Sequence, residues 1–176
     1  MNIAQIKNLD IANGPGCRVS VFVSGCTRMC KGCFNAVAWD FDYGEKFDDR
    51  TIIRILNLMS NPRISGLSVL GGEPFERRNQ KEVLRLMRSV RQSVPGKDIW
   101  CFTGYTFEQL LDSDITTTQS VEMVQLIDVL VDGPFILEQK NLALKFRGSS
   151  NQRIIDVPNS LRQGKTIIWK DKYDNF

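Results

Sequence analysis

The sequence predicts an α/β protein built on a mostly parallel β-sheet. Short apolar runs rich in Val, Ile and Phe alternate with segments of helical periodicity, and this alternation is typical of βα units around a parallel sheet. A glycine-marked loop follows four of the apolar runs, as expected where a strand ends and the chain turns. The chain has 176 residues, about the length of one domain. We therefore expect a single domain over residues 1–176, with a core at 15–157 and a C-terminal tail at 158–176.

Five apolar runs have the length and composition of strands. They lie at 19–24, 67–70, 98–102, 127–131 and 166–169. If the first four are parallel, the loops that follow them emerge at one edge of the sheet, where α/β proteins build their sites. Those loops are "GC" at 25–26, "GGEP" at 71–74, "TGY" at 103–105 and "DGPF" at 132–135. The alternative, that some of these glycines only begin a turn, stays open.

Three helices are expected between the strands. A helix at 49–60 places four apolar side chains on one face, Ile52, Ile55, Leu56 and Met59, and Asp48 or Asp49 could cap its start. A helix at 78–93 repeats this spacing with Val83, Leu86, Met87 and Val90. Thr106 and Gln109 resemble a capping box that opens a third helix at 106–111.

Composition narrows the class of protein. The net charge of +3 is too small to indicate a nucleic-acid-binding face, and no apolar stretch approaches the length of a membrane span. The N-terminal residues lack the layout of a signal peptide, so we expect a cytoplasmic protein. The chain contains no histidine, which removes imidazole from every catalytic or ligand role. Five cysteines, an odd number, indicate a metal or redox site rather than a disulfide framework.

Three of the five cysteines, Cys26, Cys30 and Cys33, lie within the stretch "CTRMCKGC". On a helix they would spread over about 10 Å of axial rise, so a loop must gather them around one centre. Gly25 and Gly32 supply the backbone freedom for such a loop. Arg28 and Lys31 add positive charge, which lowers thiolate pKa values and offsets a negative thiolate cluster.

The kind of metal follows from the number of ligands. A structural zinc site has four ligands, and only Cys17 or Cys101 could supply the fourth thiolate. We expect both to be structural, Cys101 within a buried strand and Cys17 as a small apolar side chain. Three thiolates instead favour an iron–sulfur cluster. A cluster with three protein ligands leaves one iron open, which indicates a bound substrate or cofactor.

At these residues the sequence resembles the radical SAM superfamily, whose signature is a CxxxCxxC loop after the first strand of a partial βα barrel. The resemblance implies a [4Fe-4S] cluster on the three cysteines, with S-adenosylmethionine bound to the open iron. "GGEP" matches the superfamily's second motif, so Gly71, Gly72 and Glu73 would contact the methionine amino group through the backbone. Many members carry an aromatic residue before the third cysteine. Here Gly32 stands at that place and Phe34 follows Cys33, so these residues would lie near the adenine.

Within the superfamily the chain is similar to the proteins that activate anaerobic ribonucleotide reductase. The similarity rests on "NGPGCRVSVFVSGC", "CKGCFN" with Trp39, "GGEP", "PGKDIWCFTGYTFEQL", "DVLVDGPF" and "FRGSSNQRIID". It implies reductive cleavage of S-adenosylmethionine to a 5′-deoxyadenosyl radical, which generates a glycyl radical in the large catalytic subunit of the reductase. The implied partners are that subunit and an electron donor such as flavodoxin. We expect neither a nucleic acid nor a membrane as a partner.

Two alternatives remain at this point. The chain could activate another glycyl-radical enzyme such as pyruvate formate-lyase, or it could be a non-enzymatic metal-binding or electron-transfer module that recruits Cys17. We expect the reductase to dock at the rim beside "DGPF" and "FRGSSNQR", where Arg147 lies, although a polar turn would explain the latter stretch equally well. We assign no catalytic part to the tail.

Overall fold

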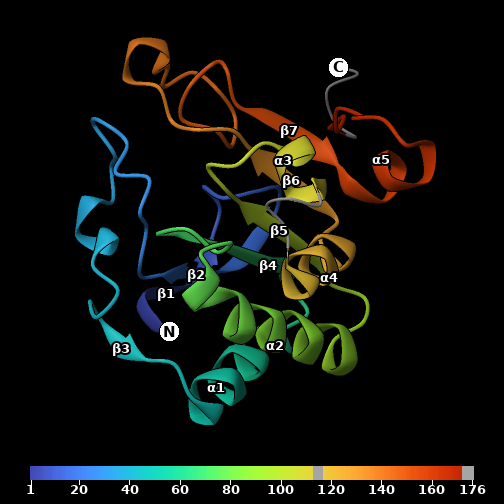
Figure 1. Ribbon diagram of the computed structural model, residues 1–176. Coiled ribbons are helices and arrows are strands. Elements are labelled where there is room, and N and C mark those ends of the chain that lie inside the picture. Colours follow the sequence, from blue (N-terminus) through green and yellow to red (C-terminus); the bar gives the residue numbers. More distant parts are fainter. Residues whose placement is uncertain (113–116, 172–176) are drawn as a thin grey trace.

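The structure, a computed structural model, describes residues 1–112 and 117–171. Within these residues the strands form one seven-stranded sheet in the order β3-β1-β2-β4-β5-β6-β7 (Figure 1). The strands are β1 (Asn2–Asp10), β2 (Cys17–Val23), β3 (Glu45–Lys46), β4 (Ile64–Gly71), β5 (Asp98–Phe102), β6 (Val129–Asp132) and β7 (Arg153–Asp156).

The centre of the sheet is parallel, as predicted. β2 pairs with β4, β4 with β5 and β5 with β6, all in parallel, whereas β1 and β3 on one side and β7 on the other pair antiparallel. β2 is buried continuously from Arg18 to Val23, because a central strand has both faces covered. The four glycine-marked loops therefore do emerge at one edge of the sheet.

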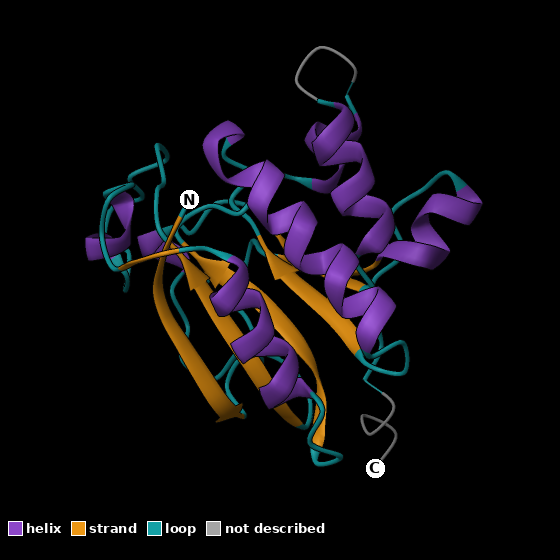
Figure 2. Ribbon diagram, turned by 90° about the horizontal axis from the view of Figure 1, so that it is seen from below, coloured by secondary structure: helices purple, strands orange, loops and turns teal. Residues whose placement is uncertain are grey.

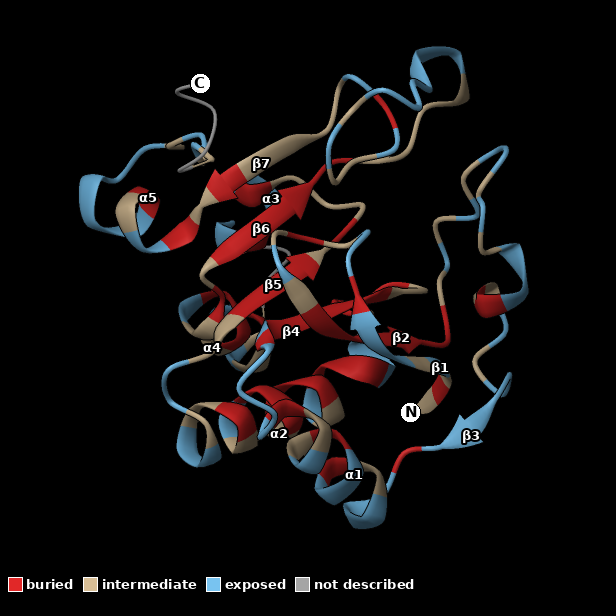
Figure 3. Ribbon diagram, turned by 180° about the vertical axis from the view of Figure 1, so that it is seen from behind, coloured by how far each residue is buried: buried red, intermediate tan, exposed pale blue. Residues whose placement is uncertain are grey.

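Three helices cover one face of the sheet (Figure 2). They are α1 (Asp49–Met59), α2 (Arg77–Ser93) and α4 (Thr118–Leu126), and two shorter helices, α3 (Phe107–Leu111) and α5 (Val157–Gln163), lie near β6 and β7. Short 3-10 helices occupy η1 (Ala36–Trp39) and η2 (Leu137–Gln139). The main core lies between this helical layer and the sheet, and Figure 3 shows the buried strands from the opposite face.

Helices α1 and α3 begin with the capping contacts that the sequence predicts. The Asp48 carboxylate accepts a hydrogen bond from the Thr51 amide at 2.9 Å and so caps α1. The capping box of α3 is complete, with the Gln109 amide donating to the Thr106 hydroxyl and the Thr106 amide donating to the Gln109 side chain. These local contacts fix where each helix leaves the loop before it.

A second, smaller apolar cluster lies on the other face of the sheet. Trp100 is its centre, with its ring 5.5 Å from that of Phe146 and 5.1 Å from that of Trp169, both edge to face. Trp100 alternates along β5 with Cys101, which points into the main core. Residues of the C-terminal tail therefore help to cover the face that the helices leave open.

Several elements differ from the sequence-based expectation. The predicted strand at 166–169 is wrong: Ile168 forms a single antiparallel bridge with Ile155, because these residues only flank the edge strand β7. β1, β3, β7, α4 and α5 were not predicted. The antiparallel strand β1, which lies between β2 and the two-residue edge strand β3, is partly exposed and carries a mixed polar pattern, so it lacks the apolar run that marks a central strand. Part of the predicted tail, residues 172–176, lies outside the described residues.

Among the described residues, no helix combines the length and apolar character needed to cross a membrane.

The orientation of α2 can be tested by truncating its buried face. Met87 is fully buried, so Met87→Ala should lower the free energy of unfolding by about 2–5 kcal/mol because a cavity remains. Lys81→Ala, on the exposed side of the same helix, is the matched control and should change it by no more than about 0.5 kcal/mol. Chemical denaturation of both variants measures the difference, and equal losses would contradict this orientation.

Candidate functional site

A cavity of about 460 Å³ opens at the carboxyl edge of the parallel strands. This volume suits a small-molecule ligand. Every site residue singled out from the sequence lies on its wall: Cys26, Cys30, Gly32, Cys33, Phe34, Gly71, Gly72 and Glu73. The remaining wall comes from the loops after β5 and β6, from the segment after Asp10, from the last residues of β4 and β5, and from Arg28 and Trp39. The fold thus brings together residues that are distant in sequence.

The cysteine loop leaves the end of β2 and returns to it. The Gly25 amide donates to the Ala38 carbonyl at 2.8 Å and the Cys26 amide to the Trp39 carbonyl at 3.1 Å, which closes the loop at its base. Met29 and Gly32 adopt left-handed backbone conformations, with φ of 45° and 74°. Such conformations wrap the chain tightly and cluster at functional sites.

The three thiols share the cavity without meeting at one point. Among the described residues, no set of three or more Cys, Asp or Glu side chains is close enough together to hold a single metal ion. A mononuclear zinc site needs all of its ligands around one ion, whereas a cubane cluster binds each thiolate at a different iron and so accepts a wider spacing. The donor set and the cavity therefore fit a cluster better than zinc.

The other two cysteines are not available to this site. Cys17 is the first residue of β2 and Cys26 lies beyond its last, so the length of the strand, about 20 Å, separates them. Cys101 is fully buried in the main core on the helical side of β5, as predicted. Neither can act as a fourth ligand without refolding the sheet.

Cys26 is the most strongly perturbed of the three candidate ligands. Burial raises the pKa of its thiol to about 11, and the carboxylates of Glu73 and Glu76 add to this shift. The thiol is therefore neutral at pH 7 in the metal-free protein. Binding of a metal centre must displace its proton, which couples cluster assembly to pH.

The double glycine of the "GGEP" loop allows a close approach to the cysteine loop. The Gly72 amide donates to the Val23 carbonyl at 2.7 Å, and the Glu73 amide donates to the Gly25 carbonyl at 2.9 Å. A Cβ atom at Gly72 would lie 2.6 Å from the Gly25 carbonyl oxygen. A protonated amino group donates hydrogen bonds, so only carbonyl oxygens of this loop could receive one, and that of Glu73 already accepts from the Asn79 side chain.

The Glu73 side chain has a role that the sequence did not suggest. It is buried, and its carboxylate accepts hydrogen bonds from the Thr103 hydroxyl at 2.8 Å and the Gly104 amide at 2.7 Å. Burial raises the pKa of this carboxyl, and these hydrogen bonds act in the opposite direction. Glu73 thus joins the loop after β4 to the loop after β5.

Asn79 in the first turn of α2 and Glu76, the residue before this helix, were not predicted as site residues, and both contact the cysteine loop or the residues that precede it. The buried Asn79 amide donates to the Ser24 carbonyl at 2.9 Å and to the Glu73 carbonyl at 3.0 Å. The Glu76 carboxylate accepts from the Thr27 amide at 2.8 Å. Asn79 lies four residues before Val83 and therefore on the apolar face of α2. A polar residue on an apolar helix face is the sequence feature that could have identified it as a structural contact.

The loops "DGPF" and "FRGSSNQR" pack against each other. Gln152 donates to the Gly133 carbonyl at 3.1 Å and Asn151 to the Pro134 carbonyl at 2.8 Å. Arg147 donates to the Gln152 carbonyl at 2.7 Å and lines the cavity. The polar side chains of this stretch are therefore used within the protein, and reversing the charge at Arg147 would disturb the loop itself.

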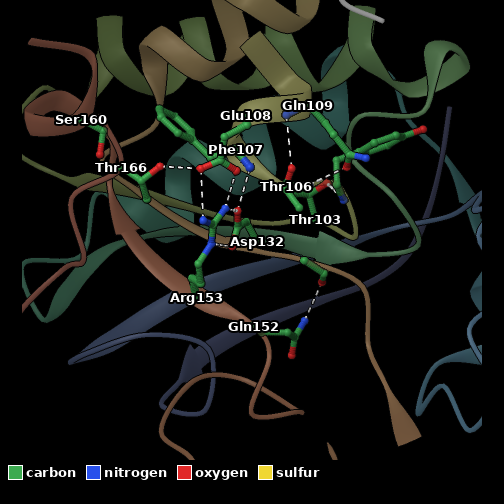
Figure 4. A network of polar contacts seen from close by, with 12 residues as sticks. Thr103, Thr106, Phe107, Glu108, Gln109, Asp132, Gln152, Arg153, Ser160 and Thr166 are labelled. Carbon is green, nitrogen blue, oxygen red and sulfur yellow. Dashed lines mark hydrogen bonds and ion pairs between the residues drawn. The ribbon is translucent and has the colours of Figure 1, made fainter. Parts of the chain in front are cut away.

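Beside these loops, an ion-pair network ties β6, β7, α3 and the tail together (Figure 4). Arg153 donates to Asp132 at 3.0 Å and to Glu108 at 2.6 Å, and the Thr166 hydroxyl donates to Glu108 at 2.6 Å. The hydrogen bond from Arg153 is the main cause that lowers the pKa of Glu108 to about 2. Asp132 also accepts from the Phe107 amide at 2.7 Å, so the network sets the start of α3.

Sequence comparisons agree with an iron–sulfur site. The chain matches the family model for a 4Fe-4S single cluster domain over residues 12–155. It is 40% identical over 154 residues to the anaerobic ribonucleoside-triphosphate reductase-activating protein of Escherichia coli K12. The aligned residues cover 86% of this chain and 96% of that protein.

Similar values hold for the proteins of the same name from Vibrio cholerae and from Enterobacteria phage T4. The first is 42% identical over 156 residues, 88% of this chain and 97% of that protein. The second is 38% identical over 156 residues, 88% of this chain and 93% of that protein. The chain therefore belongs to the 4Fe-4S single cluster domain family and to the family of anaerobic ribonucleoside-triphosphate reductase-activating proteins.

Proposed function

We propose that this protein activates anaerobic ribonucleotide reductase by generating a glycyl radical in its large catalytic subunit. The observation that carries the proposal is a cavity whose wall holds Cys26, Cys30 and Cys33 while the other two cysteines are out of reach. Three thiolates would hold a [4Fe-4S] cluster and leave one iron for a ligand bound in the cavity. We infer that this ligand is S-adenosylmethionine.

Held by Cys26, Cys30 and Cys33, a reduced cluster would supply one electron to the sulfonium of S-adenosylmethionine. Cleavage of the bond from sulfur to C5′ would then give methionine and a 5′-deoxyadenosyl radical, which would take a hydrogen atom from the target glycine. Such a step needs a strongly reducing cluster, and cluster potentials extend to about −700 mV. The protein supplies binding, orientation and exclusion of water.

The residues of the cavity suit these tasks. The Glu73 carbonyl already accepts hydrogen bonds from the Asn79 side chain and the Glu76 amide, so the carbonyl oxygens of Gly71 and Gly72 would receive the amino group of methionine. Phe34 lines the cavity although 83% of it is exposed, so its ring is free to stack on the adenine beside Gly32. The sheet with its one-sided helical layer would be the incomplete βα barrel of radical SAM enzymes, with the whole chain acting as one domain.

The partner would close the mouth of the cavity. Leu142, from the loop after β6, is 89% exposed and lines the cavity, as does Phe34 from the cysteine loop. The large reductase subunit would cover these apolar side chains and shield the radical from water. This places docking at the cavity mouth between the cysteine loop and residues 133–152. An electron donor such as flavodoxin would reduce the cluster in the cytoplasm.

Two experiments separate this function from its alternatives. After anaerobic reconstitution with iron and sulfide, addition of dithionite and S-adenosylmethionine should yield 5′-deoxyadenosine, which a non-enzymatic module would not produce. Mixing with the reductase subunit should then give the electron paramagnetic resonance signal of a glycyl radical. A signal only with pyruvate formate-lyase would assign the chain to that enzyme instead.

The ligand set can be tested one cysteine at a time. Cys26→Ser, Cys30→Ser and Cys33→Ser should each lose bound iron and lower the yield of 5′-deoxyadenosine to background, because each removes one of three protein ligands. Cys17→Ser is the matched control and should retain both. Loss of iron in Cys17→Ser, with iron retained in any of the other three, would contradict the assignment.

Cluster uptake should depend on pH. Because the pKa of the Cys26 thiol in the metal-free protein is about 11, the thiol must release a proton when it binds iron. The apparent affinity of the protein for iron is therefore expected to increase from about pH 7 to 9. The release of the Cys26 proton contributes about tenfold per pH unit to this increase. Competition against an iron chelator, corrected for the protonation of the chelator, measures the slope, and a flat profile would be inconsistent with a neutral Cys26.

A further inference from the structure

Arg28 lies inside the cysteine loop, between Cys26 and Cys30, and reaches across to the loop after β5. Its guanidinium carbon is 4.7 Å from the centre of the Tyr105 ring. Its side chain also packs closely on Gly104, where a Cβ atom would be only 2.3 Å from the Arg28 Nε atom. Only glycine at position 104 leaves room for this arrangement, so the two loops are shaped to each other.

The residues around Arg28 hold its guanidinium close to the cysteine loop. Arg28 lines the cavity, and its Nε atom is buried and makes no hydrogen bond within the described residues. Its charge attracts the buried Glu73 carboxylate, which itself bonds the Gly104 amide. An arginine held between an aromatic ring and a glycine backbone keeps its position better than one in solvent.

The backbone of the same residue faces the first cysteine. The backbone amides of Arg28 and Met29 act to lower the pKa of the Cys26 thiol, against the larger effect of burial. Hydrogen bonds to ligand sulfurs and nearby charge are two of the factors that set the potential of an iron–sulfur cluster. Arg28 thus presents an N–H donor and a fixed positive charge to the same side of the site.

We propose that Arg28 is a positioning residue that docks the cysteine loop on Tyr105 and Gly104 and, through its fixed charge, makes the cluster easier to reduce. The inference rests on the proposed function, because it takes the cluster to be held by Cys26, Cys30 and Cys33. The physical reason is that reduction adds a negative charge to an already negative thiolate cluster, and a nearby cation stabilises the reduced form. The effect is strong only where solvent does not screen the charge.

Lys31 provides a matched control for this claim. It lies in the same loop and carries the same charge, but it is exposed and forms no hydrogen bond or ion pair with the described residues. Solvent screens such a charge. Removal of either charge changes the net charge of the protein equally, so a difference between the two variants reports position rather than total charge.

The test is an anaerobic redox titration of the reconstituted cluster, followed by electron paramagnetic resonance without S-adenosylmethionine. In Arg28→Gln the midpoint potential should shift to more negative values with iron content retained, whereas Lys31→Gln should stay close to the wild-type protein. Arg28→Lys should lie between wild type and Arg28→Gln. An unchanged potential in Arg28→Gln, or an equal shift in Lys31→Gln, would overturn the proposal.

A second variant keeps the test decisive if Arg28→Gln fails to hold iron. Tyr105→Leu leaves every charge in place and removes only the ring on which the guanidinium rests. Its potential should shift in the same direction as that of Arg28→Gln, and no shift would contradict the proposal. Formation of 5′-deoxyadenosine by the wild-type protein is measured alongside. Failure of that reaction would refute the proposed function, whereas its success with unchanged potentials would refute only the role of Arg28.

Discussion

The site depends on one close approach of two backbones, where the chain from Gly71 to Glu73 runs against the end of β2. Amide hydrogen bonds of 2.7 and 2.9 Å join it to Val23 and Gly25. A side chain at Gly72 would strike the Gly25 carbonyl, and neither backbone can give way, since each continues a buried central strand. Because Gly25 immediately precedes Cys26, this contact fixes the point at which the cysteine loop leaves the sheet. Glu73 and Asn79 then extend the same constraint to the loop after β5 and to the start of α2.

The parallel centre of the sheet could be predicted because its strands are buried on both faces and read as apolar runs. The outer, antiparallel strands could not be predicted in this way. β1 and β7 are antiparallel, partly exposed strands whose sequences, "NIAQIKNLD" and "RIID", carry too few apolar residues to stand out. The apolar run at 166–169 led to a wrong strand prediction. Its Trp169 packs on Trp100 in the smaller apolar cluster, so the residue is partly buried by a side-chain contact and does not belong to a strand.

The same contrast holds within the site. The cysteine spacing and the double glycine are local patterns, and the structure places them on one cavity wall. The supporting contacts join residues far apart in the chain, such as Glu73 with Thr103 and Asn79 with Ser24, and a single sequence contains no direct record of them. In a chain without histidine, the charged residues on the cavity wall are Arg28, Glu73, Lys140 and Arg147, beside the three cysteines. The bound groups would supply the reactive chemistry.

The central claim is that three cysteines leave one iron of the cluster open to a ligand in the cavity. Mössbauer spectroscopy of protein reconstituted with ⁵⁷Fe tests it most directly, because each iron contributes according to its own ligands. Addition of S-adenosylmethionine is expected to change the parameters of one iron in four and to leave those of the other three unaffected. Four irons that remain alike and fully thiolate-ligated after the addition would contradict it.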